Sequence, residues 1–292
     1  MTVFEMRYAS DGTQTAAIRS AFEQYGVVLL RGFEFHLDGF ESMTRQFCKD
    51  FHGVGTRQVL RQTAGDGFTT EVFRNNFILL GHSEGAYRPY PPPPEVCFFM
   101  CVTPPVEAGG ETTLVDGVEM LEVMPDDLRF RLEDTGVTYE SRWEAERWKN
   151  EFGVHTEKEL RALLGRFKNV RFSLADGMLH LYYSAPAITC TRSGSAAFIN
   201  GVLAHLPQIA HPRYKGLPVY VKPTNRVYFG DGELLADEVV NALIDAHDRV
   251  SYHHRWMAND VLIVDNTRYM HGREMTAQPC ERILISRFGH LR

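Results

Sequence analysis

The sequence predicts a mainly β fold with flanking helices, built around a double-stranded β-helix, or jelly roll. Short apolar and β-branched segments predominate from Thr69 onward, and turn formers such as Gly109-Gly110 separate them. Regular alternation of strands with helices is absent. A doubly wound parallel sheet needs that alternation, whereas antiparallel sandwiches and barrels need only short strands and turns. No glycine group forms a GxGxxG or Walker pattern, so neither type of nucleotide site is expected.

In the N-terminal part, helical and strand patterns precede the β-rich region. Apolar residues recur at helical spacing over 15–25, which predicts a helix there. A buried strand should follow over 26–31, because this segment is short, apolar and β-branched. The next elements expected are a second helix at 40–51 and strands at 96–102 and 112–115.

The second half of the sequence mixes further helices with strands. Pro125 suits the first turn of a helix over 123–132, and a capping-box pattern at Thr156 and Glu159 predicts the start of another. An Ala-Asp-Gly turn between two apolar segments predicts a hairpin of 170–174 with 178–183. The remaining elements expected are a strand at 196–200, a helix at 235–250, and strands at 261–265 and 282–288, with His271 in the loop between the last two.

Length and composition fit one globular domain. Residues 1–292 are expected to form a single domain with a helical, lid-like insertion around 117–170, in which the charge-rich run 142–149 is a solvated helix or part of the lid. The net charge of −6 argues against nucleic-acid and anionic-membrane partners, which require basic surfaces. Five scattered cysteines without a signal-peptide pattern indicate a reducing compartment, so we expect a cytoplasmic protein.

A histidine and a carboxylate lie two residues apart in Gly81-His82-Ser83-Glu84-Gly85. In an extended strand, residues i and i+2 project to the same side, so both side chains can face one ion. Two histidines and one carboxylate with open positions form the ligand set suited to Fe(II) that also binds O2 and a cosubstrate. The triplet alone is not specific, and the third ligand must come from elsewhere in the fold.

A second group of residues near the C-terminus strengthens this interpretation. The apolar strand 261–265 is followed by His271, and Arg282 opens the next apolar strand eleven residues later. An arginine at the head of an apolar strand is unfavourable unless it pairs with an anion, and its planar fork suits a carboxylate. The far carboxylate of 2-oxoglutarate would satisfy it. Asp265 and Asn266 are expected to fix the loop before His271 by hydrogen bonds.

These motifs together resemble the TauD/TfdA (taurine dioxygenase and clavaminate-synthase-like) family of Fe(II)/2-oxoglutarate oxygenases. The resemblance covers roughly Gly26 to Arg287 and includes a glycine pair before Thr112 and the segment 256–266. It implies that His82, Glu84 and His271 bind iron and also form the catalytic centre. It further implies that Arg282 and Thr112 bind the far carboxylate of 2-oxoglutarate, with O2 as the second cosubstrate.

Two departures from the family pattern narrow the function that the resemblance implies. Many members use aspartate where this chain has Glu84, although clavaminate-synthase-like members also use glutamate. Halogenating relatives have a small residue there, so the glutamate favours hydroxylation or another oxidation. Taurine-type enzymes carry a substrate-binding arginine four residues after the cosubstrate arginine, but this chain has Ser286, and Arg287 should face the opposite side of the strand. A sulfonate substrate is therefore not expected.

Candidate substrate contacts surround the predicted iron ligands. Asn76 precedes them and Ser286 replaces the taurine-type arginine, while Tyr87, Arg88 and Tyr90 lie in a proline-rich stretch just after Glu84. The proline run is stiff and Gly85 suits a hinge, so residues 85–94 are expected to close over bound substrate as a lid. An alternative is that the run is a ligand for a proline-recognising domain.

The expected function is oxidation of an unactivated C–H bond in a small metabolite, either amino-acid-derived or a natural-product intermediate, by hydroxylation, desaturation or cyclisation. One alternative is a JmjC-like protein hydroxylase or demethylase, although that group usually binds 2-oxoglutarate through a lysine of another strand. The other is a metal-binding jelly-roll module without turnover. The substrate partner is a small molecule in the favoured interpretation, and homo-oligomerisation is left open.

Overall fold

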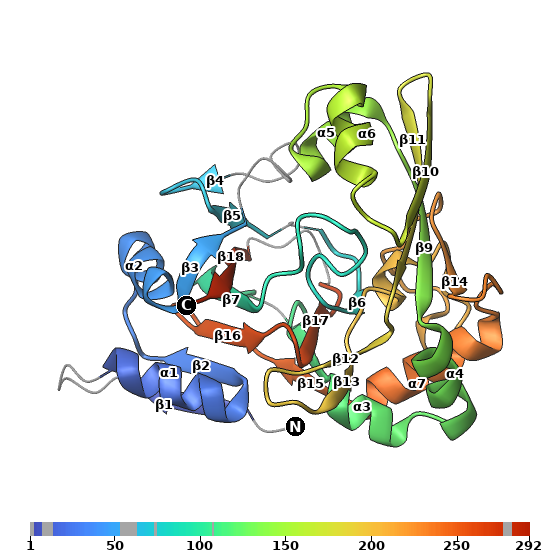
Figure 1. The fold of residues 1–292 in the computed structure, drawn as a ribbon. Helices are drawn as coiled ribbons and strands as arrows, with labels where there is room; N and C mark the ends of the chain where they lie inside the picture. Colours follow the sequence, from blue (N-terminus) through green and yellow to red (C-terminus); the bar gives the residue numbers. More distant parts are fainter. Residues whose placement is uncertain (1–2, 8–13, 53–62, 73–74, 107, 277–281) are drawn as a thin grey trace.

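Two β-sheets face each other at the centre of the computed structural model, which describes residues 3–7, 14–52, 63–72, 75–106, 108–276 and 282–292 (Figure 1). The larger sheet has the order β1-β2-β16-β7-β18-β5-β4, and β3 pairs with β18 beside this path. Its strands are β1 (Phe4–Arg7), β2 (Val27–Arg31), β3 (Cys48–Phe51), β4 (Thr63–Ala64), β5 (Thr69–Glu71), β7 (Val96–Thr103), β16 (Val261–Asp265) and β18 (Ile283–Leu291). The smaller sheet has the order β15-β8-β17-β6 and consists of β6 (Leu79–His82), β8 (Thr112–Asp116), β15 (Ser251–His254) and β17 (Tyr269–Arg273). These opposed sheets form the jelly roll that the sequence predicts.

The central strands of the larger sheet are buried on both faces. Along β16, Val261 and Ile263 pack with the helices on the outer face, whereas Leu262 and Val264 pack toward the smaller sheet. Successive side chains of a strand point to opposite faces, so a strand that is covered on both faces is apolar throughout. This is why 261–265 is recognisable as a buried strand from the sequence.

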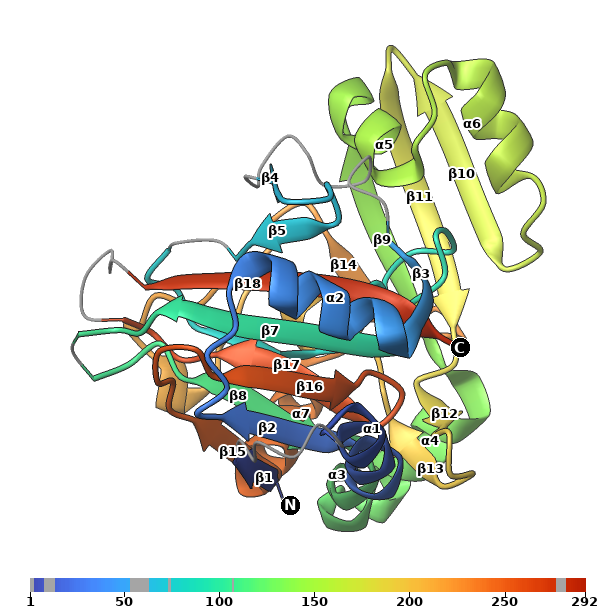
Figure 2. The same cartoon turned by 90° about the vertical axis from the view of Figure 1, so that its left-hand side faces the viewer.

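Two helices, α1 (Gln14–Tyr25) and α2 (Leu37–Phe47), cover the outer face of the larger sheet (Figure 2). Their aromatic side chains, including Phe22 and Phe40, are buried against it. The helix expected over 40–51 is wrong at its end, because Cys48–Phe51 forms β3 and pairs with β18. Pairing with a strand far along the chain outweighs the local helical periodicity there.

The insertion after β8, expected to be helical and lid-like around 117–170, contains strands as well as helices. It contains α3 (Gly117–Val123), α4 (Asp126–Thr135), α5 (Ala145–Phe152) and α6 (Glu157–Leu164). A third, antiparallel sheet of order β10-β11-β9-β14 accompanies these helices and consists of β9 (Val137–Trp143), β10 (Val170–Ala175), β11 (Met178–Ala185) and β14 (Arg226–Phe229). The solvated helix expected at 142–149 is wrong in part, because Trp143 and Trp148 are buried in a core between this sheet and α5 and α6. Figure 1 shows α5, α6 and the adjoining ends of β10 and β11 at the top, beyond the jelly roll.

One apolar core joins the third sheet to the jelly roll. Leu80 of β6, Val115 of β8 and Met270 of β17 belong to the same cluster as Val137 and Phe229 of the third sheet. This continuity supports the expectation of one domain.

The remaining elements are β12 (Ile188–Cys190), β13 (Ala196–Phe198), the 3₁₀ turns η2 (Leu203–His205) and η3 (Pro212–Tyr214), and α7 (Asp237–Val250).

Local sequence signals account for several element boundaries. The capping box at Thr156 and Glu159 is present, and α6 begins directly after Thr156. Asp176 and Gly177 both have positive φ, 51° and 76°, as a tight hairpin turn requires, and they connect β10 to β11.

Candidate active site

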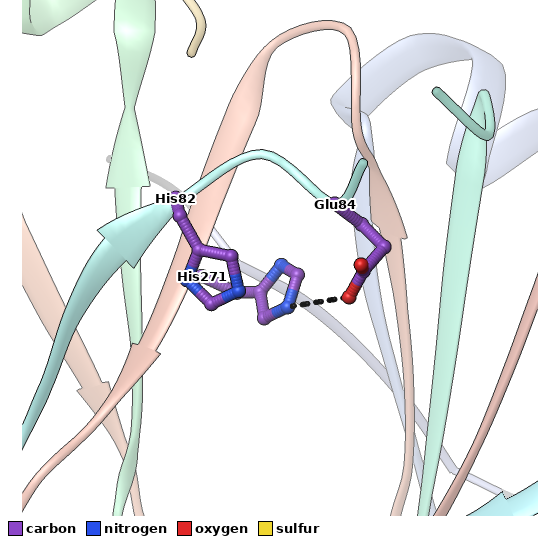
Figure 3. Close-up of side chains that lie close together, drawn as sticks. All are labelled: His82, Glu84 and His271. Carbon is purple, nitrogen blue, oxygen red and sulfur yellow. Dashed lines mark ion pairs between the residues drawn. The ribbon is translucent and has the colours of Figure 1, made fainter. Parts of the chain in front are cut away.

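His82 and His271 lie side by side on adjacent strands of the smaller sheet. His82 ends β6, and His271 occupies the middle of β17, where the two residues are partners in the antiparallel pair. The expectation that His271 lies in a loop is therefore wrong, since 269–273 is a strand that also pairs with β8. Glu84 lies in the turn just beyond β6, and its side chain points toward the two imidazoles (Figure 3).

The three side chains converge on one point. One ligand atom from each lies within 4.8 Å of the others, and His271 Nε2 is 4.0 Å from Glu84 Oε2. Glu84 and His271 are only 6% and 7% exposed, and the Phe99 ring of the larger sheet lies 5.1 Å from the His271 ring. Two imidazole nitrogens and one carboxylate gathered at one place form a donor set that fits Fe(II).

Asn266 fixes the turn that carries Glu84. Its side-chain oxygen accepts a hydrogen bond from the Glu84 main-chain N–H at 2.9 Å. Its amide nitrogen donates to the main-chain oxygens of Glu84 and Pro94, at 3.2 and 2.8 Å. Asp265 in turn accepts from the main-chain N–H of Thr267 at 2.8 Å. The expectation that Asp265 and Asn266 fix this part of the chain by hydrogen bonds agrees with these contacts.

Two residues that the sequence did not single out set the position of β6. A Cβ at Gly272 would lie 2.3 Å from the carbonyl oxygen of Leu79, so only glycine lets β17 approach β6 this closely. On α7, His247 Nε2 accepts a hydrogen bond from the Gly81 N–H at 3.1 Å, and its Nδ1 lies 2.9 Å from Asp248 Oδ1. A single glycine and a histidine near a helix end are common structural residues, so no local pattern marks them.

Thr112 is the first residue of β8 in the smaller sheet, and Arg282 directly precedes β18 in the larger sheet. Trp256 Nε1 donates to Thr112 Oγ1 at 3.0 Å, so the hydroxyl oxygen acts as an acceptor and its hydrogen is directed elsewhere. Arg282 is 6% exposed and precedes β18, and its Cδ would be 3.4 Å from a Cβ at Gly110. Burial raises the pKa of the Cys101 thiol to about 12, and the nearby Arg282 charge counteracts part of that rise.

Residues 4–287 match the family described as Taurine catabolism dioxygenase TauD, TfdA family. The chain belongs to this family. It is therefore an Fe(II)- and 2-oxoglutarate-dependent dioxygenase. This finding favours the small-molecule oxygenase expected from the sequence over the JmjC-like enzyme and the non-catalytic metal-binding module. No helix in the part of the chain that the structure describes is both long and apolar enough to cross a membrane.

Some relatives of this TauD/TfdA dioxygenase have names that refer to an amino acid or to a compound derived from one. A tyrosine isonitrile desaturase of Pseudomonas aeruginosa is 28% identical over 271 residues, which are 91% of this chain and 78% of that protein. The PvcB protein from Pseudomonas aeruginosa superposes with a TM-score of 0.60 at 16% identity, over 99% of this chain and 88% of that one. An asparagine oxygenase in complex with Fe(II), 3-hydroxyasparagine and succinate has a TM-score of 0.56 at 13% identity, over 94% and 77%. The two structural matches show the fold.

The proline-rich stretch of the dioxygenase contacts α5 near one end and Asn266 at the other. Arg88 is fully buried, and its Nη1 donates to the Glu151 carboxylate of α5 at 2.6 Å. The Tyr87 hydroxyl donates to the same carboxylate at 3.2 Å, and the Pro94 carbonyl is bound by Asn266. Tyr90 is 40% exposed. These contacts connect residues 85–94 to α5 and to the turn after β16, and closure of the stretch over substrate stays a prediction.

The other two candidate substrate residues, Asn76 and Ser286, lie in different segments of the chain. Asn76 is half-buried in the segment before β6. Ser286 is fully buried on the face of β18 turned toward the smaller sheet, and its hydroxyl lies 3.3 Å from that of Thr70. Arg287 faces the other way, as expected, and pairs with Asp66 at 2.7 Å.

Proposed function

We propose that His82, Glu84 and His271 hold Fe(II) in this enzyme and that its substrate is a small, amino-acid-derived metabolite with an unactivated C–H bond. The convergence of the three side chains within 4.8 Å carries the proposal. When bound, Fe(II) supplies the redox chemistry that couples conversion of 2-oxoglutarate and O2 to succinate and CO2 with oxidation of the substrate.

The chain's own residues position the reactants. Cross-strand pairing fixes His271 relative to His82, and Asn266 fixes the main chain of Glu84. Arg282 offers a planar pair of donors that suits the far carboxylate of 2-oxoglutarate. Thr112 can donate its hydroxyl hydrogen to the same carboxylate, because its oxygen already accepts from Trp256. The buried Phe99 ring of the larger sheet lies against His271 and excludes water from the side of the imidazole that faces this sheet.

The relatives support both hydroxylation and desaturation as outcomes. One relative is a tyrosine isonitrile desaturase, and one structural neighbour is an asparagine oxygenase bound to its hydroxylated product. Both names refer to amino acids or their derivatives, which supports an amino-acid-derived substrate here. Glu84 supplies the carboxylate ligand that halogenating relatives lack, so chlorination is not proposed. Four cysteines in the described residues are free thiols, which supports a reducing compartment such as the cytoplasm.

The iron assignment is tested without any substrate. Anaerobic addition of Fe(II) and 2-oxoglutarate should give the weak visible absorption of their chelate in the wild-type enzyme. His82→Ala and His271→Ala should each abolish it, because two protein ligands of three are then left. Circular dichroism would check that both variants fold. Full absorption in both folded variants would refute the assignment.

A further inference from the structure

A lysine ammonium is held beside the candidate active site by two aromatic side chains. Lys222 Nζ contacts His205 Nε2 and lies 4.7 Å from the centre of the Tyr87 ring. The rings of His205 and Tyr87 stack with their centroids 4.2 Å apart. His205 Nδ1 lies 2.8 Å from the carbonyl oxygen of Gly201, which can only accept, so Nδ1 carries the hydrogen and Nε2 accepts from the lysine.

His205 itself adds no charge to this place. Burial lowers the pKa of His205 well below its usual value, and the charges of Lys222, His82 and Arg147 lower it further. The imidazole is therefore neutral at pH 7 and serves as a fixed acceptor for the lysine. The turn η2, which carries His205, packs against β6, the strand that ends at the candidate iron ligand His82.

Main-chain contacts place both segments of this cluster along β6. Val219, three residues before Lys222, forms a parallel bridge with Ile78, the residue directly before β6. Asn200, in the turn that leads to η2, accepts a hydrogen bond from the Ser83 N–H at 2.9 Å. The lysine and the histidine therefore approach the end of β6 from one side, where the chain turns toward Glu84 and Tyr87.

Two arginines add positive charge near these rings, one over Tyr87 and one over Trp143, whose ring centre lies 6.4 Å from that of Tyr87. The Arg88 guanidinium carbon lies 5.6 Å from the centre of the Tyr87 ring, and its Nε and Nη2 are buried without a hydrogen-bond partner among the described residues. Arg147 contacts the Trp143 ring and forms no ion pair with any residue that the structure describes. Glu151 pairs with Arg88 and is the carboxylate of this group. Buried donors without acceptors are unfavourable unless a ligand satisfies them.

We propose that this cationic cluster, with Lys222 as its anchor, binds a carboxylate of the substrate. The inference rests on the proposed function and narrows it to small molecules with a free carboxylate, such as amino acids modified at nitrogen or on the side chain. A lysine already held by His205 and Tyr87 loses less conformational entropy on binding an anion than a flexible surface lysine does. The substrate carbon to be oxidised would then extend from this anchor toward Glu84.

A substitution that removes the charge of Lys222 but keeps its hydrogen bond to His205 distinguishes binding of a substrate carboxylate from structural support of the two rings. In Lys222→Gln, the amide can still donate to His205 Nε2, but the positive charge is gone. Lys222→Arg keeps the charge. Lys215→Gln is a matched control, because Lys215 is exposed in the same segment between η2 and β14. A lysine that only supports the two rings would not distinguish a substrate acid from its uncharged amide.

The test is an anaerobic titration of the enzyme loaded with Fe(II) and 2-oxoglutarate. The probes are the standard L-amino acids, the isonitrile acid of tyrosine, and the primary carboxamide of each, and binding is followed by the change in visible absorption. At least one acid should bind the wild type about 30-fold more tightly than its amide, as expected for a charge-assisted contact. Lys222→Gln should remove that preference by weakening the acid alone, whereas Lys222→Arg and Lys215→Gln should keep it.

Three outcomes would overturn the inference: no acid binds the wild type, amides bind as tightly as acids, or folded Lys222→Gln retains the preference. If Lys222→Gln does not fold, the comparison of acid with amide in the wild type and in Lys222→Arg still decides. Failure of the wild-type enzyme to form the 2-oxoglutarate chelate would instead contradict the proposed function, so the two failures are distinguishable.

Discussion

Replacing Gly272 by alanine would separate the two strands that carry the candidate histidine ligands. The added Cβ would lie 2.3 Å from the carbonyl oxygen of Leu79 and 3.1 Å from the main-chain nitrogen of Gly81, whereas ordinary contact begins at 3.4 Å. Both neighbours are main-chain atoms of β6 and cannot rotate away. Because the protein interior is close-packed, β17 and β6 must therefore move apart by roughly 1 Å.

A displacement of this size changes the spacing of His271 and His82. Misplacement of a catalytic group by about 1 Å can lower the rate about 100-fold. We therefore expect Gly272→Ala to bind Fe(II) more weakly and to form product about 100-fold more slowly at a fixed Fe(II) concentration. The measurements are an anaerobic Fe(II) titration with saturating 2-oxoglutarate, followed by succinate and product formation in air.

Gly39→Ala provides the matched control. Gly39 lies in α2, far from the ligands in sequence, and the nearest atom to its added Cβ is Phe35 Cδ1 at 3.4 Å. Alanine stabilises a helix interior by up to about 1 kcal/mol relative to glycine, so this variant should be at least as stable as the wild type and equally active. If Gly272→Ala matched the wild type in Fe(II) binding and turnover, strand spacing would not be what sets the ligand geometry.

Two further substitutions test the cosubstrate anchor and a buried ion pair. Arg282→Leu should raise the 2-oxoglutarate concentration needed for half-maximal turnover about 30-fold, because one charge-assisted contact is lost; an unchanged requirement would exclude the role. Arg31→Leu should lower the free energy of unfolding at pH 7 by about 3 kcal/mol, because the buried Asp260 loses its partner at 2.6 Å. Burial alone would raise the pKa of Asp260, but hydrogen bonds from Arg31 and His254 lower it overall. This stability is therefore present above the unfolded pKa of about 4 and is lost as the pH falls through the folded value, so the deficit in urea unfolding should shrink toward pH 3. A constant deficit from pH 3 to pH 7 would contradict the assignment.

The fold class and the central strands could be predicted because their signals are local. Residues 261–264 of β16 are all apolar because both faces of the strand are covered, and the hairpin of β10 and β11 follows from its Asp-Gly turn. The candidate iron site was also accessible from the sequence. His82 and Glu84 are two residues apart, and the distant His271 and Arg282 each flank an apolar strand.

The parts that could not be predicted depend on pairing between distant segments. Cys48–Phe51 is a strand because β18 lies beside it, and β17 is a strand because β8 and β6 flank it. The contact between His205 and Lys222 also depends on segments that are distant from β6 in the sequence. Neither residue belongs to a motif, and the two meet only because the segments before them run along β6.

The strands that come last in the sequence occupy central places in both sheets. β16 lies between β2 and β7, β18 between β7 and β5, and β17 between β8 and β6. While residues 261–291 are still inside the ribosome, the earlier strands therefore have unpaired edges facing gaps in each sheet. Such unpaired edges are prone to aggregation until the missing strands are available to pair with them. A stop codon before residue 261 would remove β17, the strand that carries His271 and pairs with β6, and would therefore not give a shortened enzyme.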